Sequence, residues 1–194
     1  MEIGASKAVQ DRLKTTKIEE SKGASLVFCW DTHLTKIKGR NVLFIVNASN
    51  RYTIAMTDIE PRNWNYYTMY IRSVIHGVMQ EMGYSEDQIG QYFKMSGDTT
   101  VTKTHGRKSV GGINRMVMDA QYFGKKLEKE AKYQWELSKY LNRDICQPEG
   151  FDAYGYPSEL FKLDMERLGI AAKREPAKVI DFAQYIENNC GTND

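Results

Sequence analysis

Residues 42–46 read Val-Leu-Phe-Ile-Val, and this unbroken apolar run of strand length decides the fold class. Such a run, rich in β-branched and aromatic residues, predicts a central strand of a sheet. Turn-forming residues precede it at 38–41 and follow it at 48–50. The flanking segments 25–30 and 51–56 also have the composition of strands. We therefore expect three consecutive strands in an antiparallel meander.

Helices are predicted on both sides of this block. Ser6 is a suitable N-cap for a short helix over residues 7–13. Residues 63–82 carry apolar side chains at spacings of three and four, which predicts a helix with one buried stripe. Ser85 and Gln88 form a capping-box pattern for a shorter helix that ends near residue 93.

The second half of the chain is predicted to be mainly helical. Apolar residues keep a helical spacing from about Gly111, and we expect one long helix reaching as far as Leu141. Ser158 precedes another predicted helix, and Pro176 can occupy the first position of a last one. Shorter strands are expected at 2–5 and 99–104.

The predicted architecture is α+β: a small antiparallel sheet packed by helices, followed by a helical C-terminal extension. We expect a domain over residues 1–122 and an extension over 123–194 that continues from the long helix. The length of 194 residues suits one domain with such an appendage.

Composition excludes several classes of protein. The 27 basic and 25 acidic residues give a net charge of +2, so any affinity for nucleic acid must come from local clustering. Three scattered cysteines without a CxxC pair indicate reduced thiols rather than a disulfide framework. No apolar run reaches the roughly 20 residues that span a bilayer, and residues 1–14 lack the apolar core of a signal peptide. We expect a cytoplasmic protein with no membrane partner.

The most biased segment is 103–115, which is basic and rich in glycine. Across residues 99–126, six basic residues against one acid leave a local charge of +5. Glycines at 106, 111 and 112 lie near the expected helix start, where backbone N–H groups and the helix dipole favour anions. Phosphates of RNA or DNA, or an acidic protein surface, fit such a junction; the alternative is a basic loop whose glycines serve packing. The candidate binding residues are Lys103, Arg107, Lys108, Arg115, Lys125 and Lys126.

No strong catalytic or metal-binding motif is present. The sequence lacks a Ser–His–Asp, HExxH, EF-hand or Walker pattern, so we expect no metal and no cofactor. His33 and His105 are the alternative: as an acid and a base near one phosphate, with a cation beside them, they would form a ribonuclease-like site.

Aromatic residues on the charged segment after residue 123 suggest a second surface. Tyr133, Trp135 and Tyr140 lie among many charged residues, where one small domain cannot easily bury them. We expect them to contact a partner, the C-terminal helices or a second copy of the chain, which would give a homodimer.

Several of these segments together resemble a small domain family of unknown function found in bacteria, plasmids and phages. The resemblance covers roughly residues 1–122, and residues 123–194 lie outside it. The matching residues are Ile3, Ser6-Lys7, Leu13, Trp30, Leu34, Ile37, Arg40, Leu43 to Asn47, Tyr52-Thr53, Lys103-Thr104, Arg107, Gly111 and Asn114. Four positions depart from the family's pattern: His33 and His105 replace Asn, Lys108 replaces Ser, and Arg115 replaces an acidic residue.

The resemblance implies a context, because proteins of mobile elements often inhibit host defences, anti-CRISPR proteins included. The leading hypothesis is a non-enzymatic inhibitor that masks a host defence protein or ribonucleoprotein through the basic strand–helix junction. The alternatives are a nuclease acting on RNA through His33 or His105 and a nucleic-acid-binding regulator.

Overall fold

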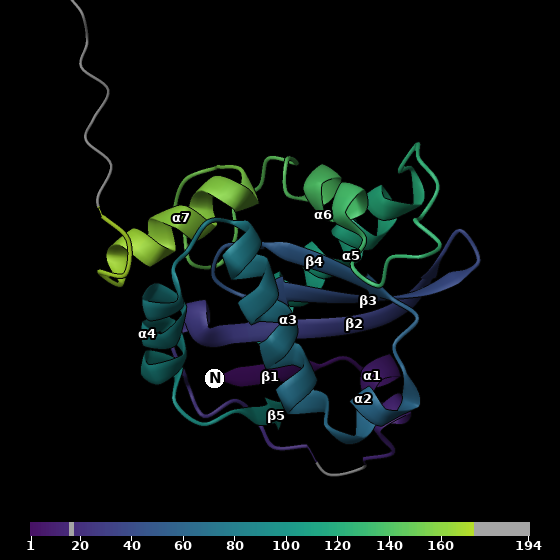
Figure 1. Ribbon diagram of the computed structural model, residues 1–194, viewed down its shortest axis with the longest axis horizontal. Coiled ribbons are helices and arrows are strands. Elements are labelled where there is room, and N and C mark those ends of the chain that lie inside the picture. The colour runs from purple at the N-terminus through teal and green to yellow at the C-terminus, as the bar shows by residue number, and fades with distance from the viewer. Residues whose placement is uncertain (16–17, 173–194) are drawn as a thin grey trace, which may run out of the picture.

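The computed structural model describes residues 1–15 and 18–172, which form one five-stranded sheet with helices packed around it (Figure 1). The strand order is β4-β3-β2-β1-β5. The strands are β1 (Glu2–Ala5), β2 (Cys29–Ile37), β3 (Arg40–Asn47), β4 (Thr53–Thr57) and β5 (Thr100–Thr102). The helices are α1 (Lys7–Leu13), α2 (Pro61–Asn65), α3 (Tyr67–Glu81), α4 (Glu86–Ser96), α5 (Gly106–Gln121), α6 (Trp135–Leu141) and α7 (Pro157–Arg167), with a 3₁₀ turn over Leu26–Phe28.

The α+β class is confirmed, but the sheet is mixed rather than wholly antiparallel. Strands β2, β3 and β4 form the expected antiparallel meander. Strand β1 lies between β2 and β5 and is parallel to both. This arrangement places β1 in the interior of the sheet and brings the β5–α5 connection beside β2.

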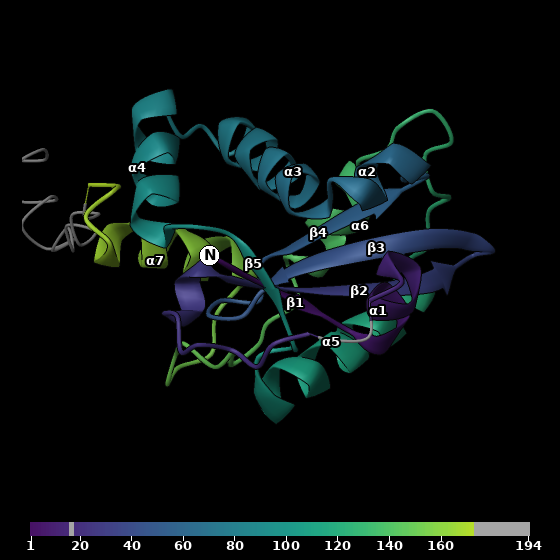
Figure 2. The same cartoon turned by 90° about the horizontal axis from the view of Figure 1, so that it is seen from below.

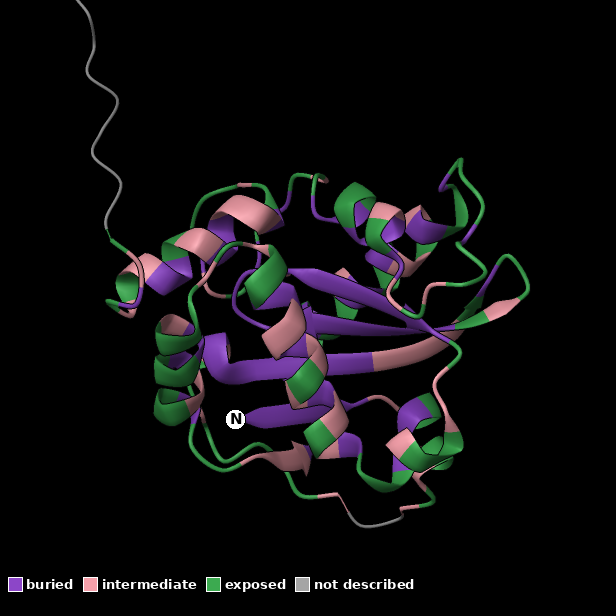
Figure 3. Cartoon of the chain, in the orientation of Figure 1, coloured by how far each residue is buried: buried purple, intermediate pink, exposed green. Residues whose placement is uncertain are grey.

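Helices cover both faces of the sheet, as Figure 2 shows with α3 on one side and α5 on the other. One core cluster joins the α3 face to Trp30, Leu43 and Ile45, while a second joins the α5 face to Val42 and Phe44. Because neighbouring residues of a strand point to opposite faces, the apolar run 42–46 supplies both clusters. Figure 3 shows the result: the central strands are buried along most of their length, and the helices keep an exposed side.

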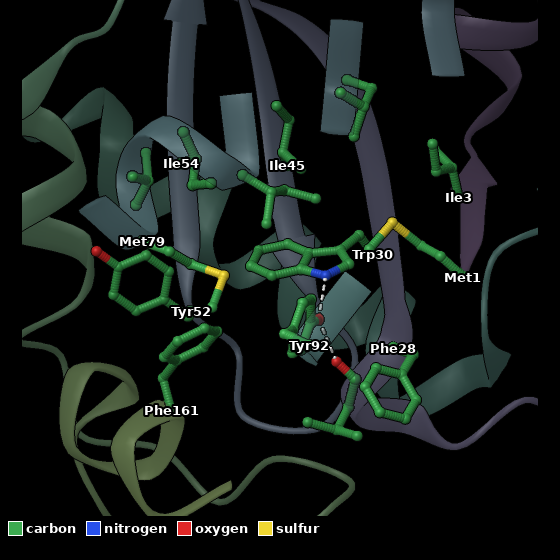
Figure 4. Packing of buried hydrophobic residues seen from close by; sticks show 14 of the residues in the cluster. Met1, Ile3, Phe28, Trp30, Ile45, Tyr52, Ile54, Met79, Tyr92 and Phe161 are labelled. Carbon is green, nitrogen blue, oxygen red and sulfur yellow. Dashed lines mark hydrogen bonds between the residues drawn. The ribbon is translucent and has the colours of Figure 1, made fainter. Parts of the chain in front are cut away.

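Trp30 anchors the larger cluster. Its indole Nε1 donates a hydrogen bond of 2.9 Å to the Tyr92 hydroxyl, which in turn donates to the backbone carbonyl of Val27 (Figure 4). Phe161 of α7 packs against Trp30 and Tyr52. Helix α7 therefore belongs to the same core as the sheet.

The prediction of one long helix from Gly111 to Leu141 is wrong. Helix α5 begins five residues earlier, at Gly106, and ends at Gln121; a connection follows, and α6 begins at Trp135. Residues 132–134 pair instead with the outer edge of β4: the Thr57 N–H donates to the Lys132 carbonyl, and the Gln134 N–H donates to the Ala55 carbonyl. An edge strand presents open N–H and C=O groups, and this pairing satisfies them.

Three other predicted helices have different outcomes. The helix expected over 63–82 is divided at Tyr66 into α2 and α3. The capping box of α4 is confirmed, because Ser85 Oγ accepts from the Gln88 N–H and Gln88 Oε1 accepts from the Ser85 N–H. The helix expected after Pro176 lies outside the described residues.

Candidate functional site

A buried polar network lies where β1 and β2 meet the start of α5. His105 Nδ1 is 2.7 Å from Asp31 Oδ1, and His105 Nε2 is 3.0 Å from Glu2 Oε2. The second oxygen of Asp31 accepts from the Ser109 hydroxyl. Each of these four residues is less than a tenth exposed. Three elements, each supplying part of the network, are therefore held together by charge-assisted hydrogen bonds.

Backbone groups complete the network. The His105 N–H donates to both oxygens of Asp31, at 3.1 and 3.3 Å. The Lys22 N–H donates to Glu2 Oε1 at 2.8 Å. Both carboxylates are thereby fixed in orientation although they lie inside a strand, where a charged group normally requires such partners.

The network determines the charge state of His105. Burial disfavours the imidazolium, but hydrogen bonds to Asp31 and Cys29, with the charge of Asp31, outweigh it and raise the pKa of His105 to about 10. Burial likewise opposes ionisation of Glu2, yet hydrogen bonds from Ser21, the Lys22 amide and His105 lower the pKa of Glu2. At neutral pH His105 is a cation between two carboxylates.

Cys29 lies beside this network at the start of β2. Ligand atoms of Glu2, Cys29 and His105 all lie within 4.8 Å of one another, and all three residues are buried. The Cys29 thiol donates to the Ser25 carbonyl at 3.4 Å. These residues have the chemistry of metal ligands.

The outer side of α5 is a second feature of this region. One stripe of exposed residues runs along the helix, because its members recur at spacings of three and four: Arg107, Gly111, Asn114, Met118 and Tyr122. We call these five residues, with Val110 and Arg115 beside them, the α5 outer face. Met118 is 63% exposed and Tyr122 is 81% exposed, although the outward side of an amphipathic helix is normally polar.

The predicted basic residues do not form one undivided patch. Lys103 pairs with Glu20, and Lys125 pairs with Glu136. Lys108 donates to the Pro148 carbonyl at 3.2 Å. The two ion pairs offset part of the excess charge that the sequence alone assigns to segment 99–126, and the carbonyl contact holds the Lys108 ammonium in place.

Arg107, Arg115 and Lys126 keep most of their charge available. All three are exposed. Arg115 lies 4.0 Å from Asp119, which is a loose contact, and within the described part of the chain Arg107 and Lys126 have no acidic partner at ion-pair distance. Two of these cations, Arg107 and Arg115, lie on the α5 outer face.

His33 and His105 do not form an acid–base pair. Both ring nitrogens of His105 face carboxylates, and the ring is buried. His33 lies on β2 opposite Phe44, and burial lowers its pKa. The ribonuclease-like site therefore rests on the sequence alone, because His105 offers no free ring nitrogen to a phosphate that His33 could also reach.

The three aromatic residues expected to contact a partner are partly covered within the chain. Tyr133 packs against the larger core and meets the Trp135 ring edge-to-face at 5.7 Å. Tyr140 packs on Phe123 at 5.4 Å. Trp135 is 39% and Tyr140 43% exposed, and a pocket of about 290 Å³ lies beside Tyr133 and Trp135. Self-association through these residues stays a prediction.

Sequence reasoning missed Glu2, Cys29, Asp31 and Ser109. Glu2 and Asp31 offered a usable signal. Glu2 is an acidic residue inside the predicted strand 2–5, and Asp31 is an acidic residue directly after the strand-like segment 25–30. A carboxylate in a buried strand needs a cationic partner, but only the mixed sheet shows that this partner is His105.

The fold and the network define a class: an α+β domain with a buried ionisable cluster and with exposed arginines on the outer side of one helix. The chain matches the family described as Domain of unknown function (DUF6933) over residues 2–160, and it belongs to that family. The match extends beyond residue 122, where the resemblance was expected to end. No curated protein and no solved structure matches the chain.

The match agrees with the packing of the connection after α5. Phe123 and Leu127, together with Leu137 and Leu141 of α6, are buried in the cluster that covers the α5 face of the sheet. Residues 123–141 are therefore part of the packed unit rather than the continuation of a long helix. Among the helices of the described ranges, none is long and apolar enough to cross a membrane.

Proposed function

We propose that the chain is a non-enzymatic binding protein that contacts single-stranded nucleic acid, RNA or DNA, through the α5 outer face. The observation that carries this proposal is the composition of that stripe: two exposed arginines, an exposed asparagine and an exposed tyrosine on one side of a single helix. Arginine guanidinium groups bind phosphates, and aromatic rings stack on bases without sequence preference.

The charges within α5 support a polyanionic partner. The helix holds Arg107, Lys108 and Arg115 but only one acid, Asp119, which is partly buried. Along the outer face the rise of an α-helix separates Arg107 from Tyr122 by roughly 22 Å, enough to contact several nucleotides. An acidic protein would also meet the two arginines, but it would not need the stacking surface of Tyr122.

The internal position of the ionisable cluster supports a binding role over catalysis. A general acid or base must reach the proton that it transfers. His105 instead directs both nitrogens to buried carboxylates. This leaves the exposed cations and aromatic rings as the groups that can meet a macromolecule.

Binding of fluorescent oligonucleotides at low salt tests the proposal. We expect the wild-type chain to bind single-stranded RNA or DNA, and Arg107→Ala/Arg115→Ala to weaken binding at least tenfold. Tyr122→Ala removes one stacking contact, worth about 1–3 kcal/mol, and is expected to weaken binding about tenfold.

Two exposed residues on the other side of the sheet serve as matched controls. Lys94→Ala on α4 removes a cation, and Tyr66→Ala between α2 and α3 removes an aromatic ring that is 67% exposed. Both variants should bind as the wild type does. Absence of binding by the wild type, or equal losses in the controls, would contradict the proposal.

A narrower form of the proposal concerns the biological target. As a protein of a mobile element, the chain would mask the RNA or DNA of a host defence ribonucleoprotein, as an anti-CRISPR protein does. What supports this form is the resemblance together with the cationic outer face. Inhibition of such an effector by the wild type, lost in Arg107→Ala/Arg115→Ala, is the expected result.

A further inference from the structure

We propose that Glu2, Cys29 and His105 form a zinc-binding site at the junction of β1, β2 and α5. The three residues come from distant parts of the sequence, so no ligand spacing reveals them. Their ligand atoms gather within 4.8 Å of one another in the folded chain. In tetrahedral zinc sites, ligand atoms about 2.0–2.3 Å from the ion lie roughly 3.3–3.7 Å apart, and small side-chain movements bring atoms within 4.8 Å of one another to that spacing.

The orientation of His105 is the observation that distinguishes this cluster from a simple ion pair. Its Nδ1 is held at 2.7 Å by Asp31, which leaves Nε2 directed toward Glu2. Histidines that bind metals through one nitrogen usually donate the other N–H to a carboxylate. Asp31 is in turn held by Ser109 and by the His105 amide.

Glu2 is also prepared for a single-oxygen contact. Its Oε1 accepts the Lys22 amide at 2.8 Å, and its Oε2 faces His105. A carboxylate fixed in this way can offer one oxygen to an ion without reorienting. The supporting hydrogen bonds of Glu2 and His105 therefore involve Glu2 Oε1 and His105 Nδ1, and leave Glu2 Oε2 and His105 Nε2 for the ion.

The donor set selects the metal. One thiolate, one imidazole and one carboxylate suit zinc, whereas Mg²⁺ and Ca²⁺ prefer oxygen ligands throughout. Three protein ligands leave one tetrahedral position for a water molecule. Binding would release the Cys29 thiol proton and the Nε2 proton of His105 to solvent, so two positive charges leave as one divalent ion enters.

The ion would add a link between two paired strands and a helix: β1 and β2 already pair through their backbones at Glu2 and Cys29, and His105 joins them through hydrogen bonds to Asp31 and Glu2. Glu2 lies on β1, Cys29 begins β2, and His105 immediately precedes α5. Metal binding to the folded state raises the free energy of unfolding. Zinc is thus expected to stabilise the start of the helix that carries the outer face, independently of whether that face binds nucleic acid.

The test uses the metal-free full chain, titrated with Zn²⁺ and with Co²⁺ as a spectroscopic substitute. We expect one ion per chain, a thiolate-to-cobalt charge-transfer band, and a higher melting temperature with zinc. X-ray absorption at the zinc edge should show one sulfur and otherwise nitrogen or oxygen ligands. A zinc coordination shell without sulfur, or the absence of stoichiometric zinc binding by the wild type, would overturn the proposal.

Variants locate the site. Cys29→Ser and His105→Asn should each weaken zinc binding at least a hundredfold, and Cys29→Ser should abolish the charge-transfer band. Cys146→Ser is the matched control, because Cys146 is also buried but lies outside the cluster. Cys190→Ser controls for the remaining thiol. Zinc binding that survives Cys29→Ser, or that Cys146→Ser or Cys190→Ser removes, would assign the ion elsewhere.

Discussion

Gly4 faces Asp31 across the paired strands β1 and β2, and only a hydrogen atom fits between them. A Cβ atom at Gly4 would lie 1.9 Å from Asp31 Oδ1 and 3.0 Å from the Thr104 Cα atom. The Asp31 side chain cannot move aside without breaking its bonds to His105 and Ser109. The absence of a side chain at residue 4 is therefore a condition for the buried network.

Replacing Gly4 by alanine should destabilise the fold. We expect Gly4→Ala to lower the free energy of unfolding by about 1–3 kcal/mol, the usual cost of overpacking a buried site. Urea unfolding followed by circular dichroism measures this. Gly124→Ala is the control, because nothing lies within 4 Å of the added atom there. Equal stability of the two variants would show that Asp31 is not fixed.

The charge of His105 gives stability a defined dependence on pH. The folded-state pKa of about 10 lies above the ordinary value near 6.5, so the stabilisation is complete below about pH 6.5. It declines as pH rises and is lost above about pH 10. The comparison with His105→Asn, both proteins free of metal, isolates this contribution from other titrating groups.

We expect the difference in unfolding free energy between wild type and His105→Asn to be about 1–3 kcal/mol near pH 6, because the variant leaves buried carboxylates without their cation. The difference should shrink toward pH 10. Denaturant titrations across this range measure it. A difference independent of pH would mean that His105 acts as a neutral ring.

At the scale of elements, the connection between α5 and α6 closes the open edge of β4. Besides the pairing of residues 132–134, the Ser138 hydroxyl accepts the Ala55 N–H, and the Asn142 side chain bonds both backbone groups of Thr53. Helix α6 thus presents polar side chains to a strand edge. A continuous helix from α5 would leave this edge open.

Gln134 holds this connection in place. Its side chain is buried and bonds the Glu128 N–H and carbonyl, the Ala131 carbonyl and the Thr57 hydroxyl. We expect Gln134→Ala to lower the free energy of unfolding by about 1–3 kcal/mol, because several buried groups lose their hydrogen-bond partner. The exposed Gln91→Ala on α4 should change stability by less than about 0.5 kcal/mol. Hydrogen exchange at Thr57 should rise only in Gln134→Ala.

At the scale of the whole molecule, local patterns were enough for the α+β class and for most elements. The apolar run 42–46 and the capping box at Ser85 and Gln88 each act within a few residues, so the sequence reports them directly. Ser6 is the N-cap of α1 by position, but its side chain makes no capping hydrogen bond. The antiparallel meander also follows from neighbouring strands joined by short turns.

Features that depend on distant partners could not be predicted. The insertion of β1 between β2 and β5 joins residues about a hundred positions apart. The network of Glu2, Asp31 and His105 exists only because of that insertion. The charged segment after Gly124 has helical composition, yet the demand of the β4 edge for hydrogen bonds outweighs helix propensity there.

The salt dependence of nucleic-acid binding tests the central claim, that the α5 outer face contacts phosphates, most directly. For single strands the slope of log K against log salt changes by about 0.7 for each phosphate contact. If Arg107 and Arg115 each make one, Arg107→Ala/Arg115→Ala should have a slope shallower by about 1.4 than the wild type, and Lys94→Ala should keep the wild-type slope. Equal slopes for the wild type and the double variant would contradict the claim.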